Sequence, residues 1–211
     1  MAEKRSRGRP REYNRDTALG AARKVFWELG YSATSVEALC EAMGISKPSL
    51  YAGFGNKLAL YLAVLRQYDD EGFAKMQERL NHSDLATALQ QAAIGAIDNF
   101  VGGGSDPRGC LLVATAVVEA KTDQDVREEL RLAMERSGEL FAARFRKAME
   151  EEDFRSALPP QVLGTIFNDA IYAAALRARA GFKRSDLLAT LDACIAMITN
   201  AHRDDTTADR G

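Results

Sequence analysis

The chain has 211 residues, of which 46% are hydrophobic and 27% charged, and its formal net charge is −2. This balance is typical of a folded domain and excludes a wholly disordered chain, and the longest charge-free stretches fall short of the ~18 residues that a membrane helix needs. Three widely spaced cysteines argue against a disulfide scaffold or a zinc site, so we expect a cytoplasmic protein without metal, cofactor or membrane contact.

A basic arm, residues 1–13, precedes an acidic body. Residues 1–60 carry ten Lys and Arg against six Asp and Glu, a net charge of +4, whereas the rest of the chain carries −6. Arg7 and Arg9 flank a glycine, and arginines in an extended segment can follow the narrow minor groove of DNA. We favour nonspecific attraction of phosphates by this tail over contact with the minor groove, and a merely solubilising arm is a further alternative. The acidic body argues against a DNA-packaging protein, which is usually basic throughout.

Two helices are predicted after the arm. Apolar side chains at helical spacing predict a helix over 16–29, which Gly30 ends. The run Thr34-Ser35-Val36-Glu37 has the pattern of a capping box, in which the hydroxyl of Thr34 and the carboxylate of Glu37 each satisfy a free backbone N–H. This box predicts the start of a short second helix, which Gly44 ends.

A third short helix begins at Ser46, has Pro48 in its first turn and runs to about residue 52, where Gly53 and Gly55 stop it. Two short helices that meet at a tight glycine turn form a helix-turn-helix, and the second enters the major groove with its N-terminal residues. The residues in that position are Ser46, Lys47, Pro48, Ser49 and Tyr51. A plain helical hairpin that binds no DNA has the same spacing and is the alternative.

Six further helices are predicted over 56–80, 84–101, 109–120, 123–148, 160–179 and 185–201. No run of alternating β-branched residues predicts a strand, so the fold class is all-α with about nine helices. The helix over 109–120 is apolar on nearly all sides, and we expect it to be buried in the middle of the body.

Cys110 lies at the start of this apolar helix. We favour its interpretation as a small buried hydrophobic residue. The alternative is a thiol that senses electrophiles or oxidants, because a helix N-terminus lowers the pKa of a thiol and Arg108 is close in sequence.

Three segments together resemble the DNA-binding domain of the TetR (tetracycline repressor) family of bacterial regulators. They are Thr34-Ser35-Val36, the run from Ala42 to Tyr51, and Phe54-Gly55-Asn56-Lys57. The resemblance covers about residues 14–62. It implies a homodimer with a helix-turn-helix domain over 14–60 and a helical ligand-binding and dimerisation domain over 61–203. The arm over 1–13 and a frayed tail over 204–211 flank these domains.

The resemblance also assigns DNA contacts to individual residues. It implies phosphate contacts at Thr34, Tyr51 and Lys57, so the full candidate set is Thr34, Ser35, Ser46, Lys47, Pro48, Ser49, Tyr51 and Lys57, with Arg7 and Arg9 from the arm. The sequence departs from the family at two positions. Leu58 replaces the usual glutamate, and Gly53 stands where the family often has an aromatic residue or histidine, so a phosphate contact is missing there.

Candidates for the other two sites lie in the body. The family keeps an inducer cavity in the middle of this domain, and the candidate lining residues are Cys110, Val113, Thr115, Val117, Phe141, Phe145, Phe167, Asn168 and Tyr172. The family's dimer interface uses its last two helices. The candidates there are Phe167, Ile171, Ala174, Ala178, Leu188, Leu191, Ile195 and Ile198.

The sequence therefore predicts a ligand-responsive transcriptional regulator, a repressor that a small molecule releases from a near-palindromic DNA operator. Its partners are duplex DNA, a second copy of the chain and a small-molecule inducer. One alternative is a repressor that senses electrophiles or redox state through Cys110. An enzyme with an unrecognised active site is a poorer alternative, because no motif of a catalytic triad, a metalloprotease or a phosphate-binding loop is present.

Overall fold

The computed structural model of the protein describes residues 13–102 and 108–200. These residues form nine α-helices and one π-helical segment, without a strand, so the prediction of an all-α fold is confirmed. Arg7, Arg9 and the tail over 204–211 lie outside the described residues. The elements are α1 (Arg15–Ala33), α2 (Val36–Met43), α3 (Lys47–Phe54), α4 (Lys57–Leu80), α5 (Leu85–Val101), η1 (Leu112–Ala116), α6 (Val117–Glu119), α7 (Gln124–Glu151), α8 (Pro160–Arg179) and α9 (Arg184–Asn200).

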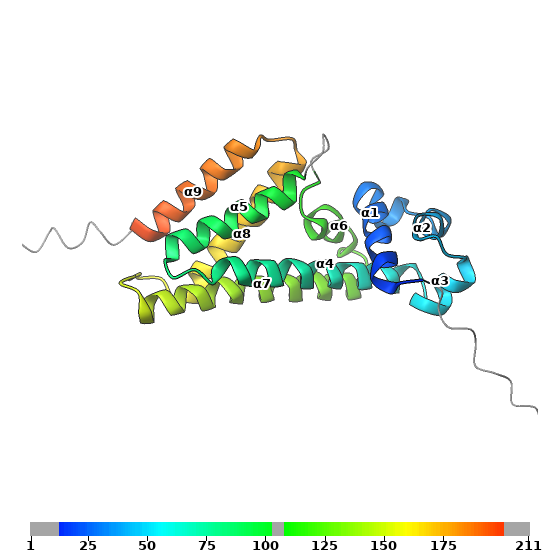
Figure 1. Cartoon of the computed structure of the whole chain (residues 1–211), viewed down its shortest axis with the longest axis horizontal. Coiled ribbons are helices and arrows are strands. Elements are labelled where there is room, and N and C mark those ends of the chain that lie inside the picture. The colour runs from blue at the N-terminus through cyan, green and yellow to red at the C-terminus, as the bar shows by residue number, and fades with distance from the viewer. Residues whose placement is uncertain (1–12, 103–107, 201–211) are drawn as a thin grey trace, which may run out of the picture.

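Helices α1, α2 and α3 gather at one end of the molecule, and the others form a longer bundle (Figure 1). Helix α4 is continuous and joins the two groups: it packs against α1 near its start, and against α5 and α7. Tyr61 on α4 marks this junction, because its buried ring lies 4.9 Å from the rings of both Phe26 and Tyr31. No described helix combines the length and the apolar content that crossing a bilayer requires.

The start of α2 differs from the predicted capping box. Ser35, not Thr34, caps the helix, and its hydroxyl accepts a hydrogen bond from the backbone N–H of Ala38. The Thr34 side chain is buried and donates to the carbonyl of Gly30 instead, because Thr34 closes the C-terminus of α1. Gly30 has a φ of 74° and breaks α1 before its last turn, as the sequence predicts.

Helix α3 continues past Gly53, so the prediction that Gly53 stops it is wrong. The helix ends at Phe54, and Gly55 follows with a φ of 88°. Gly53 has another use: a Cβ atom there would overlap the hydroxyl of Tyr13. The missing side chain therefore leaves room for Tyr13, whose ring lies 6.2 Å from that of Phe54.

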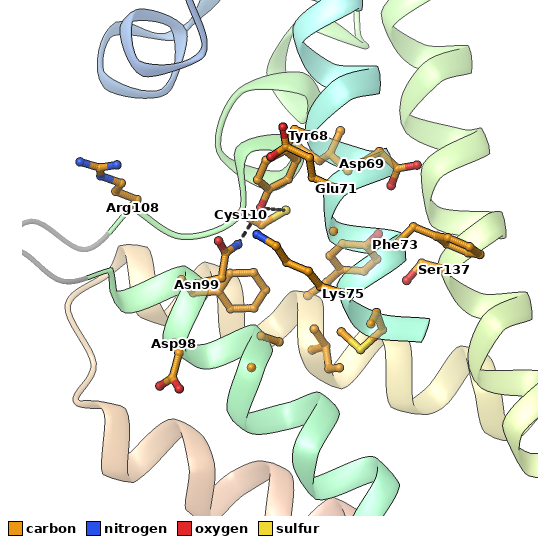
Figure 2. Close-up of a pocket in the computed structure, with 18 of the residues that line it drawn as sticks. Tyr68, Asp69, Glu71, Phe73, Lys75, Asp98, Asn99, Arg108, Cys110 and Ser137 are labelled. Carbon is orange, nitrogen blue, oxygen red and sulfur yellow. Dashed lines mark hydrogen bonds between the residues drawn. The ribbon is translucent and has the colours of Figure 1, made fainter. Parts of the chain in front are cut away.

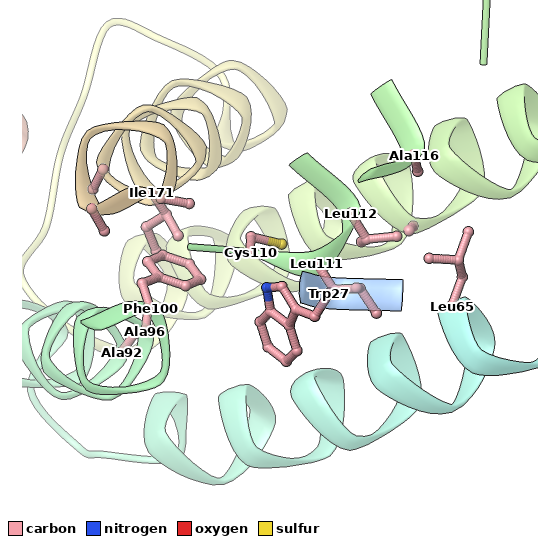
Figure 3. Close-up of a cluster of buried hydrophobic side chains, with 14 of the residues drawn as sticks. Trp27, Leu65, Ala92, Ala96, Phe100, Cys110, Leu111, Leu112, Ala116 and Ile171 are labelled. Atoms are coloured by element: carbon pink, nitrogen blue, oxygen red, sulfur yellow. The ribbon is translucent and has the colours of Figure 1, made fainter. Parts of the chain in front are cut away.

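The segment predicted as one α-helix over 109–120 contains the π-helix η1 and only a short α6. Within this segment the hydroxyl of Thr115 donates to the carbonyl of Leu111 at 2.8 Å and lies 2.7 Å from the hydroxyl of Tyr61. The expectation of burial holds for Leu111 and Leu112 (Figure 3). It is wrong at the end of the segment, where the Val117 side chain is 52% exposed.

Helices α7 and α8 approach each other closely. A Cβ atom on Gly164 would lie 2.6 Å from the backbone nitrogen of Ala142 and 2.7 Å from the carbonyl oxygen of Gly138. The rings of Phe141 and Phe167 meet edge to face across this contact, 5.1 Å apart. This contact places the side of α7 that carries Phe141 against the side of α8 that carries Phe167.

Candidate functional site

Helix α3, predicted to enter the major groove, presents a polar face to solvent. Leu50 and Phe54 are buried and anchor the helix, while Lys47, Pro48 and Tyr51 are exposed. The hydroxyl of Ser46 accepts a bond from the backbone N–H of Ser49 and so caps the helix. The two serine hydroxyls also lie 2.9 Å apart. Four of the predicted contact residues therefore lie at the N-terminal end of α3, and Tyr51 follows within the next turn.

Lys47 forms an ion pair with Glu37 of α2. This contact raises the pKa of the Lys47 ammonium and lowers the pKa of the Glu37 carboxyl, in both cases chiefly through the hydrogen bond between them. Lys47 is therefore charged, and Glu37 competes with any base or phosphate for this ammonium. The sequence analysis assigned Glu37 only to the capping box, and its ion pair with Lys47 was not predicted.

Two predicted phosphate contacts, Thr34 and Lys57, have other partners. The Thr34 hydroxyl is buried and already donates to Gly30. The Lys57 ammonium donates to the carbonyls of Tyr31 and Thr34, at 3.0 Å each, and lies 4.2 Å above the ring of Tyr31. These bonds satisfy the C-terminal carbonyls of α1, a favourable place for a positive charge. Ser35 is exposed, but its hydroxyl caps α2.

Arg15 and Tyr13 flank α3 and were missed by the sequence analysis. The guanidinium of Arg15 donates to the carbonyl of Gly53 at 3.0 Å and lies 4.5 Å above the ring of Phe54. The hydroxyl of Tyr13 is buried without a hydrogen-bond partner among the described residues. The only sequence signal for this cluster was the unusual glycine at position 53.

A cavity of about 850 Å³ lies between α1, α4, α5, α7, α8 and the segment that carries Cys110 (Figure 2). Of the residues predicted to line it, four do so: Cys110, Phe141, Asn168 and Tyr172. Most of the remaining lining was missed, because α1, α4 and α5 contribute much of it. These missed residues include Trp27, Tyr68, Asp69, Lys75, Arg79, Asn99 and Phe100.

Five predicted lining residues lie elsewhere. The side chain of Thr115 bonds to Tyr61, Phe145 packs against Phe154, and Phe167 lies behind Phe141. Val113 packs against the core, and Val117 is largely exposed. The helical pattern identified these residues as apolar, but it could not tell the cavity side of a helix from its packed side.

The thiol of Cys110 is buried in the cavity wall and accepts a long hydrogen bond from Tyr68, with 3.6 Å between oxygen and sulfur. The amide of Asn99 donates to the same Tyr68 hydroxyl at 3.1 Å, and Figure 2 shows the three side chains together. Burial raises the pKa of the Cys110 thiol above its ordinary value. The thiol is therefore protonated at neutral pH, contrary to the activation considered for a sensing cysteine.

Trp27 brings the first helix of the helix-turn-helix group into the cavity wall. Its indole N–H donates to the carbonyl of Arg108 at 3.0 Å, and its ring meets that of Tyr68 edge to face, 5.2 Å apart. Arg23 and Lys24 of α1 line the same cavity. A molecule in the cavity would therefore touch the helix on which α2 packs.

The candidates for the dimer interface are mostly covered by the chain itself. Six of the eight side chains are at least 95% buried within one protomer, so they are not free to meet a second copy. They are Phe167, Ile171, Ala174, Ala178, Leu191 and Ile195. Leu188 and Ile198 are half-buried against the same core. The apolar helix faces that were predicted to form the interface therefore belong to the core of the protomer.

Comparisons with known proteins agree with this geometry. A family model described as bacterial regulatory proteins, tetR family, matches residues 18–64, and one described as tetracyclin repressor-like, C-terminal domain, matches residues 91–187. The repressor ComR of Escherichia coli strain K12 is 38% identical over 130 residues, and the activator FasR of Mycolicibacterium smegmatis is 35% identical over 92 residues. These matches cover 61% and 44% of this chain and 61% and 42% of the relatives, less than two thirds of either relative.

A solved structure covers the chain more fully. It is a cysteine mutant of the TetR-family regulator CifR in complex with double-strand operator DNA, and it superposes with a TM-score of 0.80 at 30% identity. The match spans 89% of this chain and 98% of CifR. A helix-turn-helix at one end of an all-helical bundle, both family models and this full-length likeness lead to one conclusion: the chain belongs to the TetR family of bacterial regulatory proteins.

Proposed function

We propose that this protein is a ligand-responsive repressor of transcription that binds a near-palindromic operator as a homodimer. The observation that carries the proposal is the sharing of α1: it packs on the helix-turn-helix and also contributes Trp27 to the cavity wall. A molecule in the cavity would therefore touch α1, the same helix that supports the helix-turn-helix when it binds a duplex. We place the operator-binding domain over 14–60, the body over 61–203 and the site of action in the bacterial cytoplasm.

Operator contact is assigned to the exposed end of α3. Lys47 supplies a charged donor for guanine or phosphate, Ser49 a short hydroxyl, and Tyr51 a side chain that is 49% exposed. Thr34 and Lys57 take a supporting role, because their polar atoms hold the end of α1. Arg15, next to Gly53, adds a positive charge beside α3 where the family's usual side chain is missing.

The dimer surface is assigned to apolar side chains that remain exposed on α8 and α9. Val162, Ile166 and Leu176 are 41%, 41% and 61% exposed and lie along one face of α8. Met197 on α9 is 75% exposed, and α8 and α9 pack together. Exposed apolar residues that line up on neighbouring helices favour a self-complementary interface, and a two-fold dimer explains a palindromic operator.

Release by the inducer requires that the ligand prefer the conformation that does not fit the operator. The route runs from the cavity through Trp27 to α1, and from α1 to α2 and α3. A coupling of roughly 1–3 kcal/mol would lower operator affinity about 5- to 150-fold.

The proposal is tested by selecting duplexes from a random pool with the full-length protein and footprinting the selected sequence. We expect a near-palindromic footprint and a complex of two chains per duplex. A protein that selects no sequence, or that binds tightly as a monomer to an asymmetric site, would contradict the proposal.

Covalent sensing at Cys110 is the second candidate, because this thiol faces the cavity where a ligand would lie. Its raised pKa and its bond to Tyr68 favour a packing role over a reactive thiolate. Replacing Cys110 with serine separates the two candidates. Release by inert ligands that survives the replacement supports the cavity, whereas release only by electrophiles, lost in the variant, supports the thiol.

A further inference from the structure

The acidic side chains that line the cavity are all occupied by arginines. Asp69 pairs with Arg136 at 3.0 Å, and Glu71 pairs with Arg23 at 2.6 Å. Asp98 pairs with Arg184 at 2.7 Å. No acidic group of the lining is therefore left to receive a positively charged ligand.

Four cationic side chains of the same lining have no such partner. Lys24, Lys75, Arg79 and Arg108 make no ion pair with any carboxylate in the part of the chain that the structure describes. Figure 2 shows the ammonium of Lys75 turned inward toward Asn99 and Tyr68, while Arg108 points outward. Among the lining residues, the cations without an ion pair thus give the cavity an excess of positive over negative charge.

A glycine in the middle of α5 makes room for one of these cations. A Cβ atom on Gly95 would overlap the guanidinium of Arg79, so this guanidinium lies directly against α5 at Gly95. Glycine inside a helix costs about 1 kcal/mol relative to alanine. The sequence therefore has a weak helix residue where the Arg79 guanidinium lies against α5.

A second hollow of about 420 Å³ adjoins this point, and both Lys75 and Arg79 line it as well. Its other lining residues include His82 and a single carboxylate, Glu78, which pairs with neither cation in the described structure. The two cations therefore stand between an open polar hollow and the deeper cavity. The deeper cavity also has apolar and aromatic lining residues, among them Trp27 and Phe100.

We propose that the cavity binds an anionic amphiphile, a carboxylate with an apolar body. Its head lies between Lys75 and Arg79, and its body lies against Trp27 and Phe100. This inference deepens the proposed function and rests on it for the effect on DNA. Bonds between a carboxylate and charged donors are stronger than those between neutral groups, so a neutral or cationic analogue of the same shape binds less well.

The test uses the full chain and the fluorescence of Trp27, which is the single tryptophan of the sequence. The probes form two matched series, phenylbutyrate, phenylbutanol and phenylbutylamine, and octanoate, octanol and octylamine. We expect at least one of the carboxylates to change Trp27 fluorescence with a Kd about tenfold lower than that of its alcohol, equivalent to ~1.4 kcal/mol, and lower still relative to its amine. The better series identifies an aryl or an alkyl body.

Two variants locate the head group. Lys75→Gln combined with Arg79→Gln should reduce the preference for carboxylate over alcohol to about twofold or less, because the charged donors are gone. Arg146→Gln combined with Lys147→Gln is the matched control, since it removes the same charge from α7 outside both hollows. Gly95→Ala keeps all charges, displaces the Arg79 guanidinium and should weaken the preference without weakening α5.

The inference is overturned if no carboxylate binds, if the alcohols or amines bind as tightly, or if the preference survives in the Lys75 and Arg79 double variant. Release of a fluorescent operator duplex, selected as above, is measured separately. A carboxylate that binds with the expected preference but leaves the duplex bound supports this inference and contradicts the inducer part of the proposed function. An alcohol that releases the duplex and binds as tightly as its carboxylate supports the inducer part of the proposed function and contradicts this inference.

Discussion

Replacing Gly164 with alanine should destabilise the protein, although alanine is the better helix former. A methyl group there would lie 2.6 Å from the backbone nitrogen of Ala142 and 2.7 Å from the carbonyl oxygen of Gly138. Both are backbone atoms of α7, so relief requires α7 and α8 to move apart. Overpacking of this kind costs about 1–3 kcal/mol, and more where backbone must move. The gain in helix propensity is at most ~1 kcal/mol.

Gly20 offers the matched control, because it lies inside α1 and a methyl group there meets nothing within 4 Å. Gly20→Ala should therefore stabilise by about 0.5–1 kcal/mol, which raises Tm by up to ~4 °C in a chain of this size. Gly164→Ala should lower Tm relative to Gly20→Ala by several degrees. Thermal unfolding at one fixed protein concentration measures both, because dimerisation makes Tm depend on concentration.

The difference in Tm between Gly164→Ala and Gly20→Ala tests the close contact of α7 and α8. A Gly164→Ala variant as stable as Gly20→Ala would show that α7 and α8 are not as close as the structure has them. The same variant also probes function, since Phe141 and Tyr172 project from these two helices into the cavity. Separation of α7 and α8 would enlarge it.

Three further predictions concern the functional surfaces. Lys47→Ala should cost about 1–3 kcal/mol of binding to the selected operator if the lysine contacts a base edge, and a loss equal for all duplexes would assign it to phosphate. Leu176→Asp should give a folded monomer by light scattering and circular dichroism, whereas an unchanged dimer would exclude this face of α8. Cys110 should be alkylated by iodoacetamide more slowly in the native protein than in urea near neutral pH, because the thiol is buried and its raised pKa leaves less thiolate. The native rate should keep rising with pH above the ordinary thiol pKa, where the rate in urea levels off. Mass spectrometry measures this rate, and native alkylation as fast as in urea would revive the sensing thiol.

The Lys47 prediction has a partner in Glu37. Glu37→Gln removes the ion pair that holds Lys47 on the surface and should increase affinity for all duplexes, specific and nonspecific, at low salt. Salt titration of binding to a selected and a scrambled duplex measures this. Unchanged affinity for both would mean that the contact, which is exposed, does not restrain Lys47 in solution.

Much of the local structure could be read from the sequence, because it depends on groups a few residues apart. Ser46, Asn56, Asp84 and Asp123 all cap the helices expected to begin after them, each accepting a bond from a backbone N–H three residues on. Apolar spacing likewise located the helices and the helix-turn-helix. These signals need no knowledge of where the rest of the chain lies.

Tertiary structure decided how the helix faces were used. Ile195 and Ala174 were expected at the dimer interface, and packing within the protomer places them in its core. Thr34 was predicted to cap α2, but Ser35 caps this helix because Thr34 is buried at the end of α1.

The cavity is the clearest case of this division. Its lining joins Trp27 from α1, Lys75 from α4 and Phe100 from α5 with Cys110, and no spacing in the sequence relates these residues. Periodicity specifies which side of a helix is apolar. Whether that side meets another side chain or an empty space depends on the distance and crossing of helices far apart in the chain, which only the folded structure sets.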